Sequence, residues 1–368
     1  MPRVSDTARP SGPAPGSTTS PTDAFEVLRT FLAEHGGGTP VDYSETRVQS
    51  AATLLTRAAR RRKLGVSKVY RNHQIITGGG RVVGGFAGHL TSLASDEADR
   101  AALSIPRVRG LLTRAGIPIP EGSWFAPEDV EAGAAWFSEL GAEAVVKPAF
   151  SQDGAGVTRH VRDGETFRAA WENAVSRRGE AVGADSAVVV ERHHSGLDLR
   201  VFVVGEELVA AMARVPLFCL GDGRRTVREL ASEAAARREA HPRLGTHAHD
   251  ALAHAEASGI PLDEISEDGR PYLLGEDVAA PAGGVTVDVT GALGEELQTL
   301  AVDAAWAVPG CKAAGVDLLV QGLESVGEAV VLDVDARAGI AAHQYPWIGR
   351  RRAVADAIVQ QMAATTRG

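Results

Sequence analysis

The chain has 368 residues, a formal net charge of −9, and 44% hydrophobic against 23% charged residues. This length allows two or three domains with a substantial core, and the composition is that of a globular protein. An acidic balance excludes a general affinity for nucleic acid, and no apolar run approaches the ~20 residues that cross a bilayer. The first residues lack the pattern of a signal peptide, so we expect a cytoplasmic protein with no nucleic-acid or membrane partner. Cys219 and Cys311 are too few for a disulfide framework or a thiolate metal site, and we expect both to be buried or incidental thiols.

The N-terminal part is predicted to be a disordered tail followed by two helices. Residues 1–22 are dominated by Pro, Ser, Thr and Gly, which cannot bury enough apolar area to offset the entropy of ordering. Periodic apolar positions then predict helices over 24–35 and 45–63. The basic run at 57–63 closes the second helix, where cations suit the C-terminal dipole.

A glycine-rich stretch, "IITGGGRVVGG", follows these helices. It predicts a tight hairpin and not a phosphate loop, because no Gly-Lys-Ser/Thr follows it. A helical segment from about 95 to 115 ends at Gly116, and "IPIP" then forces an extended connection. We therefore predict an N-terminal α/β domain over 23–117.

Beyond this border, helical patterns alternate with β-branched runs. The helices are predicted near 127–139, 164–178, 226–238 and 292–306. The apolar runs are "AEAVVKP", "SAVVVE", "LRVFVVG", "ELVAAMARV", "GVDLLV" and "AVVLDVD". This mixed order predicts an α/β (α+β) fold whose sheets are covered by helices.

The stretch "VVKPAFSQDGAG" places Lys147 at a strand end before a glycine-rich loop at 151–157. A lysine charge and the amides of Gly154 and Gly156 form a phosphate-binding arrangement. A surface lysine before a turn has the same pattern.

The stretch "VVVERHHSGLDLRVFVVG" ends one strand with Glu191 and opens the next with Asp198 and Arg200. An acid at such a crossover can accept hydrogen bonds from a ribose, and nearby backbone can read an adenine edge. A β-turn with charged edges is the structural alternative. Further along, Arg214 in a strand and Arg225 before a helix are candidates for gripping an anion. That helix opens with a capping box of Thr226 and Glu229.

The stretch "VLDVDARAG" puts Asp333 and Asp335 on one face of a strand, where they repel each other unless a positive charge lies between them. The upstream run "AAGVDLLV" places Asp317 on a neighbouring strand. Carboxylates from two adjacent strands form a hard oxygen site suited to Mg²⁺. A solvated strand edge is the alternative, but Asp is disfavoured within strands.

Histidines supply two further candidates. The stretch "HPRLGTHAHDALAH" suggests zinc through His247, His249 and His254, but no fourth ligand or cysteine accompanies them, so we do not predict a metal there. His343 follows the acidic strand and is either a functional residue or a hydrogen-bonded structural histidine.

The order of these pieces resembles the ATP-grasp family of carboxylate-amine ligases over roughly residues 100–348. "VDARAGIAAHQYP" is similar to the closing motif of the D-alanine:D-alanine ligases. "GDGRRTVREL" and "GGVTVDVTG" resemble cyanophycin synthetases and the related glutathione-forming modules. The resemblance implies an ATP-grasp fold with two lobes that close on ATP: a small lobe over 118–192 with a phosphate lid, and a large lobe over 193–368 with the metal site.

The resemblance also implies ATP and Mg²⁺ as cofactors and a role for each matching residue. The nucleotide would be bound by Lys147, Gly154, Gly156, Glu191, Arg192, His194 and Asp198. Two Mg²⁺ ions would be ligated by Asp317, Asp333 and Asp335. Arg200 and Arg214 would neutralise the transferred phosphoryl group and its acceptor, and the Gly339 amide would face the oxyanion of the tetrahedral intermediate.

Four departures from the family pattern stand out. Ser104-Ile105 replaces the usual Asp-Lys, which removes one phosphate-binding lysine and leaves Arg107 or Arg109 as a substitute. The usual Glu-x-Asn is Asp333-Val-Asp335, and a proline that normally precedes the last glycine is Ala338. The Asn before the later glycine pair is also absent, residues 279–282 being "AAPA". These changes are compatible with an altered substrate or with a decayed site.

The expected activity is ATP-dependent formation of an amide bond between a carboxylate and an amine through an acyl phosphate. Amino acids or short peptides are the substrates that the resemblance implies, and relatives suggest a homodimer. The alternatives are a phosphotransferase or ring-closing ligase of the same fold, or a nucleotide-binding regulatory protein without turnover.

Overall fold

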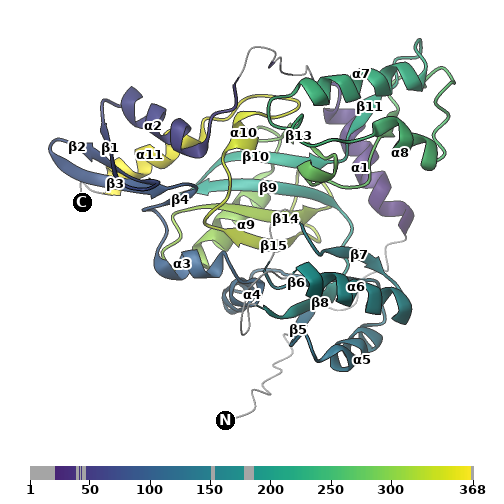
Figure 1. The fold of residues 1–368 in the computed structure, drawn as a ribbon, viewed down its shortest axis with the longest axis horizontal. Helices are drawn as coiled ribbons and strands as arrows, with labels where there is room; N and C mark the ends of the chain where they lie inside the picture. The colour runs from purple at the N-terminus through teal and green to yellow at the C-terminus, as the bar shows by residue number, and fades with distance from the viewer. Residues whose placement is uncertain are drawn as a thin grey trace.

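The computed structural model describes residues 21–38, 41, 43, 47–150, 154–177 and 186–365. Of the predicted tail, residues 1–20 lie outside these ranges, as do residues 151–153 of the predicted phosphate loop. The described residues form four antiparallel sheets with helices packed on them, which confirms the mixed fold class (Figure 1). Within the described part of the chain, no helix has the length and apolarity to cross a membrane.

The largest sheet has the strand order β13-β10-β9-β14-β15 and lies at the centre of the molecule (Figure 1). Its strands are β9 (Leu197–Val204), β10 (Glu207–Val215), β13 (Val285–Asp288), β14 (Ala313–Val320) and β15 (Val330–Asp335). Alternation gives the sheet two different faces. Leu199, Val201, Val316 and Leu318 point into the main core, which is covered by helix α9 (Glu295–Trp306). The opposite face carries the charged residues of these strands.

A second sheet forms the small lobe, at the lower right of Figure 1. Its order is β5-β8-β6-β7, and its strands are β5 (Gly122–Phe125), β6 (Ala144–Pro148), β7 (Thr158–Val161) and β8 (Val188–Arg192). Helices α5 (Val130–Leu140) and α6 (Gly164–Arg177) cover one face and form a separate core around Phe167 and Trp171. Arg159 of β7 forms an ion pair of 2.9 Å with Asp277, which lies between β12 (Pro271–Leu273) and η2 (Ala280–Ala282).

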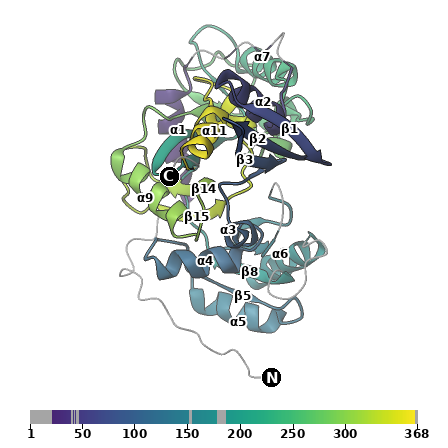
Figure 2. The same cartoon turned by 90° about the vertical axis from the view of Figure 1, so that its left-hand side faces the viewer.

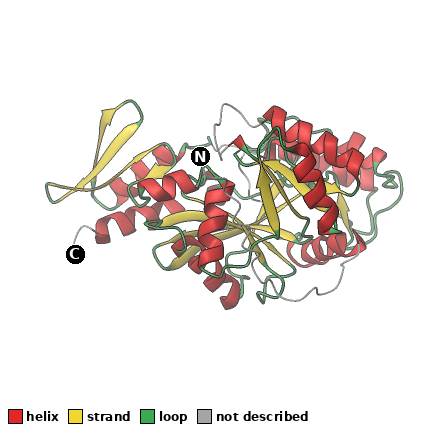
Figure 3. Ribbon diagram, turned by 90° about the horizontal axis from the view of Figure 1, so that it is seen from below, coloured by secondary structure: helices red, strands yellow, loops and turns green. Residues whose placement is uncertain are grey.

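A third sheet stands at one end of the molecule (Figure 3). It consists of β1 (Gly65–Tyr70), β2 (His73–Gly78), β3 (Arg81–Ala87) and β4 (Leu90–Thr91). Helices α2 (Ala51–Arg61) and α11 (Val354–Thr365) pack beside it, as Figure 2 shows. The shared core of this unit also includes Phe202 and Val204 of β9, so the unit covers one end of the central sheet.

The glycine-rich stretch is a hairpin, as predicted. Gly79 and Gly80 connect β2 to β3 with φ angles of +57° and +77°, a left-handed conformation that glycine adopts without strain. The basic run closes α2, also as predicted, and there Arg61 forms a 2.6 Å ion pair with Asp356 of α11.

The helix predicted over 95–115 is two helices, α3 (Asp96–Ala101) and α4 (Ile105–Arg114). Pro106 explains the break, because proline is accepted in the first turn of a helix but not in its interior. The predicted end is confirmed, since Gly116 has a φ of +71° and residues 117–121 belong to no helix or strand.

The remaining elements surround the central sheet. They are α1 (Pro21–His35), β11 (Phe218–Leu220), α7 (Val227–Ala240), α8 (Ala251–Ala257), β12 (Pro271–Leu273), η2 (Ala280–Ala282) and α10 (Ala341–Gln344). The capping box of Thr226 and Glu229 opens α7 as predicted. In this region His249 binds the Leu274 carbonyl at 2.7 Å, and the His247 carbonyl accepts a hydrogen bond from Arg238. Both cysteines are free and buried.

Candidate active site

The charged face of the central sheet gathers most of the residues predicted to carry chemistry. Arg200 of β9 lies opposite Asp317 of β14, and Asp317 lies opposite Asp333 of β15. Arg214 of β10 lies opposite Asp198 of β9. Antiparallel registry places directly opposed side chains on the same face, with Cβ atoms about 4.5–5.5 Å apart. The alternation of polar and apolar residues within each strand therefore assembles one continuous charged surface.

Two arginines on this face are held by carboxylates. Arg200 donates from Nε and Nη2 to the two oxygens of Asp317, at 2.7 and 2.6 Å. Arg214 donates to Asp198 at 2.6 Å, and its Nη2 lies 3.2 Å from Asp317. Burial acts to raise the pKa of Asp317, but Arg200 and Arg214 outweigh it and lower that pKa to about 2. Asp317 is therefore an ionised carboxylate that orients both guanidinium groups.

Asp333 and Asp335 differ from Asp317, because neither forms an ion pair with a described residue. Asp333 accepts a 2.9 Å hydrogen bond from the amide of Val334, and Asp335 accepts one of 2.7 Å from the amide of Arg337. Desolvation, followed by repulsion from Asp335 and Asp317, raises the pKa of Asp333 to about 7. Desolvation also raises the pKa of Asp335. Two adjacent acids with raised pKa values and no paired cation are a donor set that fits a divalent cation.

Asp317 differs from the other two aspartates in its partners, because both of its oxygens accept hydrogen bonds from Arg200. Among the described residues, the three aspartates form no group whose donor atoms all lie within 4.8 Å of one another. Each carboxylate oxygen has a second lone pair, so the hydrogen bonds to Arg200 leave Asp317 able to bind an ion as well.

Lys147 ends β6 beneath a buried ion-pair cluster. Its Nζ donates to Glu191 at 2.7 Å, and the other oxygen of Glu191 accepts from Arg109 of α4. Burial acts to raise the pKa of Glu191, but Arg109 and Lys147 outweigh it and lower that pKa. Burial lowers the pKa of Lys147, against the attraction of Glu191 and, more weakly, of Asp333. The predicted phosphate lysine is therefore within electrostatic range of Asp333, one of the predicted metal ligands.

The other residues predicted to bind nucleotide lie around the end of β8. Glu191 keeps its carboxylate within the ion-pair cluster, while Arg192 is exposed and paired with Glu121 at 2.9 Å. His194 is partly buried, and its Nε2 has no hydrogen-bond partner among the described residues. Burial lowers the pKa of His194, so its ring is neutral near pH 7. The segment after Glu191 thus contains a buried polar atom, His194 Nε2, that has no hydrogen-bond partner among the described residues.

The glycines of the predicted lid have the conformation that a tight loop needs. Gly154 and Gly156 have φ angles of +77° and +78°. A Cβ atom on Gly156 would lie 2.8 Å from Arg177 and 3.2 Å from Pro148, so only glycine fits beside the end of β6.

The segment that follows β15 contacts residues from other parts of the chain, including His89 in the turn between β3 and β4. The Cα of Gly339 lies close to His89, since an added Cβ would stand 3.7 Å from the His89 ring. Arg337 forms an ion pair of 2.5 Å with Asp99 of α3. His343 of α10 is buried, packs edge-to-face on Phe202, and has no hydrogen-bond partner for either ring nitrogen among the described residues. The proximity of His89 was not predicted, and no motif around residues 88–91 signals it.

Three arginines named as candidates from the sequence lie apart from this face. Arg225 pairs with Asp222 at 2.6 Å and with Glu233 at 2.5 Å at the start of α7, which is a helix-end network and not an anion grip. Of the two arginines considered as substitutes for the missing lysine, Arg109 lies in the Glu191 cluster and Arg107 is exposed. Ile105 occupies the position of that lysine and packs against Ala149 and Val189.

The chain is similar in sequence to known ligases. No family model matches the chain. A cyanophycin synthetase of Nostoc sp. is 29% identical over 264 residues, which cover 68% of this chain and 28% of that protein. A glutathione biosynthesis bifunctional protein of Enterococcus faecalis is 26% identical over 257 residues, covering 66% of this chain and 32% of that protein.

Among solved structures, a bifunctional glutathione synthetase from Pasteurella multocida superposes with a TM-score of 0.63 at 21% identity. The superposition covers 86% of this chain and 44% of that one. This chain therefore spans less than half the length of these relatives. The matches confirm the resemblance that the motifs predicted, and the superposition confirms the fold.

Proposed function

The chain has the ATP-grasp fold of the carboxylate-amine ligases, and we propose that it is an ADP-forming ligase that joins a carboxylate to an amine. In the first step a carboxylate oxygen attacks the γ-phosphorus of ATP, and the bond to the bridging oxygen breaks to release ADP. In the second step the amine displaces phosphate from the acyl phosphate, and a proton is lost as the amide forms. We propose amino acids or short peptides as both partners, since the relatives' names include glutathione biosynthesis and cyanophycin synthesis.

The observation that carries this proposal is the charge pattern of the central sheet. Asp333 and Asp335, which pair with no cation among the described residues, lie beside two arginines whose guanidinium groups are already oriented by Asp317 and Asp198. The ammonium of Lys147 is attracted by one of these carboxylates, Asp333. Phosphoryl transfer needs little covalent chemistry from the protein and depends on placing positive charge around the phosphates.

The residues of this face then have separate tasks. Asp333 and Asp335 would hold Mg²⁺, which when bound neutralises the charge on the nucleotide phosphates. Lys147 binds a phosphate of the nucleotide, and the segment from Glu191 to His194 binds the adenine. Arg200 and Arg214 bind the transferred phosphoryl group, and they need little reorganisation because aspartates already fix them. The Gly339 amide donates to the oxyanion that forms when the amine attacks.

The proposal is tested by measuring ADP release in the presence of Mg²⁺, ATP and a panel of paired amino acids and dipeptides, with mass spectrometry of the products. Asp333→Asn should lower amine-dependent turnover at least ~100-fold, because it removes one of the two unpaired carboxylates. Asp303→Asn, on the exposed side of α9, is the matched control and should leave turnover unchanged.

Other outcomes separate the alternative functions. Tight ATP binding without amine-dependent ADP release across the panel would favour a regulatory nucleotide-binding protein. Phosphorylated product without amide formation would favour a phosphotransferase. Equal turnover of Asp333→Asn and the unmodified chain would contradict the assignment of the metal ligands. The homodimer that relatives suggest is measured in the same preparation by sedimentation equilibrium.

A further inference from the structure

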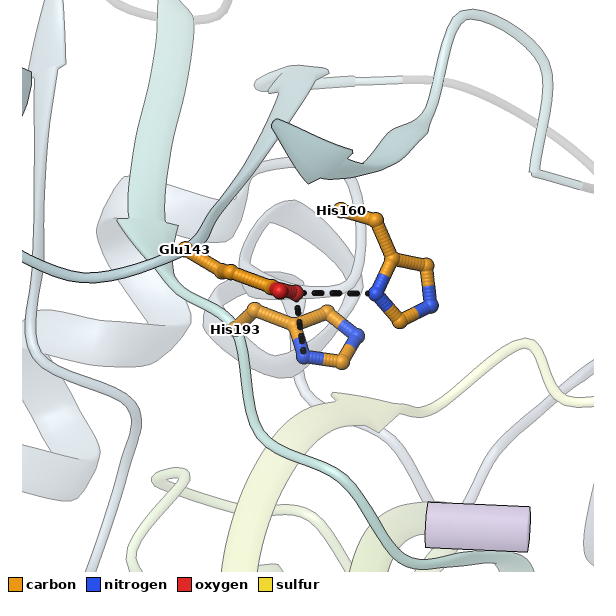
Figure 4. Close-up of side chains that lie close together, drawn as sticks. All are labelled: Glu143, His160 and His193. Atoms are coloured by element: carbon orange, nitrogen blue, oxygen red, sulfur yellow. Dashed lines mark hydrogen bonds and ion pairs between the residues drawn. The ribbon is translucent and has the colours of Figure 1, made fainter. Parts of the chain in front are cut away.

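A cluster of one glutamate and two histidines lies on the small lobe, outside the charged face (Figure 4). Glu143 directly precedes β6, His160 belongs to β7, and His193 directly follows β8. These three strands are neighbours in the sheet, and their ends meet because Ala144 is paired with both Val161 and Arg192. The cluster therefore joins three chain segments at one end of the sheet.

The donor atoms of this cluster converge on a common point. His160 Nδ1 lies 2.9 Å from Glu143 Oε2, and His193 Nδ1 lies 4.0 Å from the same oxygen. All three donor atoms lie within 4.8 Å of one another, the one such group of three found in the described residues. Ligands at about 2.0–2.1 Å from a tetrahedral zinc ion stand about 3.3 Å apart, so small side-chain rotations suffice to surround an ion.

The backbone of His160 provides a second, independent observation. Two residues of β7, Arg159 and His160, face the single residue Val145 of β6, which makes a β-bulge. His160 adopts a φ of +56° there, in the left-handed region that favours glycine. The bulge turns the imidazole toward Glu143, and the chain keeps a histidine where glycine is the unstrained choice. Strain of this kind gathers at ligand sites.

We propose that Glu143, His160 and His193 form a binding site for Zn²⁺ or a similar first-row divalent cation. Two imidazole nitrogens and one carboxylate oxygen are a known zinc ligand set, with a water in the remaining position. His160 is about half exposed, which leaves an open side for the ion and its water.

The two carboxylate oxygens of Glu143 have different partners. One is held by an arginine, which would act as an outer-sphere partner, and the other is left to bind an ion. Arg162 binds Glu143 through Oε1 at 2.6 Å, so Oε2 is the oxygen directed at the two imidazoles. The His193 amide also donates to the Glu143 carbonyl at 2.8 Å, which holds the two residues side by side. Burial, followed by repulsion from His160, lowers the pKa of His193 to about 4, so this ring is neutral near pH 7, as a ligand must be. A bound ion would link the segment after β8 to the start of β6 and to β7.

The proposal is tested by titrating the metal-free full chain with Zn²⁺ in a calorimeter, and with Co²⁺ while recording its visible absorption. The Asp333→Asn/Asp335→Asn background removes the acidic pair on the other lobe as a competing site. We expect one equivalent of ion to bind, with a Co²⁺ spectrum typical of low coordination number. His160→Gly and Glu143→Gln should weaken binding at least about tenfold.

The choice of variants separates loss of a ligand from loss of the fold. His160→Gly places glycine where its φ is favoured, so its melting temperature should be equal to or above that of the unmodified chain. His73→Gln, on the exposed strand β2, is the matched control and should bind normally. The proposal is overturned if the unmodified chain binds no ion, if His160→Gly and Glu143→Gln bind as the unmodified chain does, or if His73→Gln loses binding to the same extent.

Discussion

Arg109 and Glu191 show how single residues far apart in the sequence build the site. Both are almost fully buried, with 4% of each side chain exposed, and they are joined by a short charge-assisted hydrogen bond. A second oxygen of Glu191 binds Lys147, so one carboxylate pairs with two cations. Removing a donor from such a buried cluster leaves an acceptor oxygen without a partner, which costs more than the net worth of the hydrogen bond itself.

Arg109→Met is therefore expected to reduce the free energy of unfolding by about 3 kcal/mol, because one oxygen of Glu191 and the carbonyl of Pro120 each lose their buried donor. Urea unfolding followed by circular dichroism measures this change. Arg114→Met, at an exposed position of the same helix, should change the free energy by less than about 0.5 kcal/mol. Equal effects of the two substitutions would show that the buried cluster does not stabilise the small lobe.

A site residue can be predicted from the sequence when the residues next to it in the chain form a recognisable pattern. Asp333 and Asp335 alternate with valine, so their shared face follows from strand geometry alone. Arg109 lies 82 residues from Glu191, and nothing in "IPRVRGLLTR" distinguishes it from Arg107 until the helix is docked. His89 also reaches Gly339 only through tertiary packing. Asp317 pairs with Arg200 because of the register between β14 and β9. The spacing of residues along the sequence does not determine that register.

Strand β14 packs closely against the segment that follows β15. Gly315 of β14 lies opposite Asp335, and a Cβ atom on Gly315 would stand 2.6 Å from the Cβ of Ala338. The segment that carries Gly339 therefore packs directly on the backbone of β14. The helices and strands themselves were largely predictable, since long periodic segments match the observed elements. The places where one element ends and the next begins were not. The break between α3 and α4 follows from Pro106, a signal that the apolar pattern obscured.

Gly315→Ala is expected to displace the loop at 336–339, because the new methyl group overlaps Ala338. The expected cost is about 1–3 kcal/mol of unfolding free energy, together with a loss of ligase turnover greater than the change in ATP affinity. Thermal unfolding and steady-state kinetics measure the two effects. Gly322→Ala, where no atom lies within 4 Å of the added Cβ, is the control. A Gly315→Ala chain with unchanged kcat would argue against a role for this loop in the second chemical step.

Across the whole molecule, two deeply buried histidines link stability to pH. Burial lowers the pKa of His241 to about 4 and that of His343 to about 3. The unfolded chain has histidine pKa values near 6.5, so on acidification it takes up protons before the folded chain does. The contribution of these two histidines to the free energy of unfolding should therefore fall as the pH drops from about 6.5 toward 4. Asp333, whose pKa is raised to about 7, contributes in the opposite direction, because the folded chain protonates this carboxylate before the unfolded chain does.

The expected loss between pH 7 and pH 5 is on the order of 1–2 kcal/mol for each of these histidines. Urea unfolding at pH 7, 6 and 5 measures it. His343→Leu fills the same apolar surroundings without a titrating group, so its stability should depend less steeply on pH. A slope in His343→Leu as steep as in the unmodified chain would show that His343 is not kept neutral by the fold.

The end unit of α2, β1–β4 and α11 has a consequence for the order of events during synthesis. Arg61 meets Asp356 across 295 positions of sequence, and the same interface buries Leu55 against Ile358 and Met362. A ribosome must therefore polymerise nearly the whole described chain before this interface exists, and closing so long a loop is entropically slow. Until then the apolar side of the hairpin sheet faces water, which makes the nascent polypeptide a natural client for chaperones that shield exposed strands.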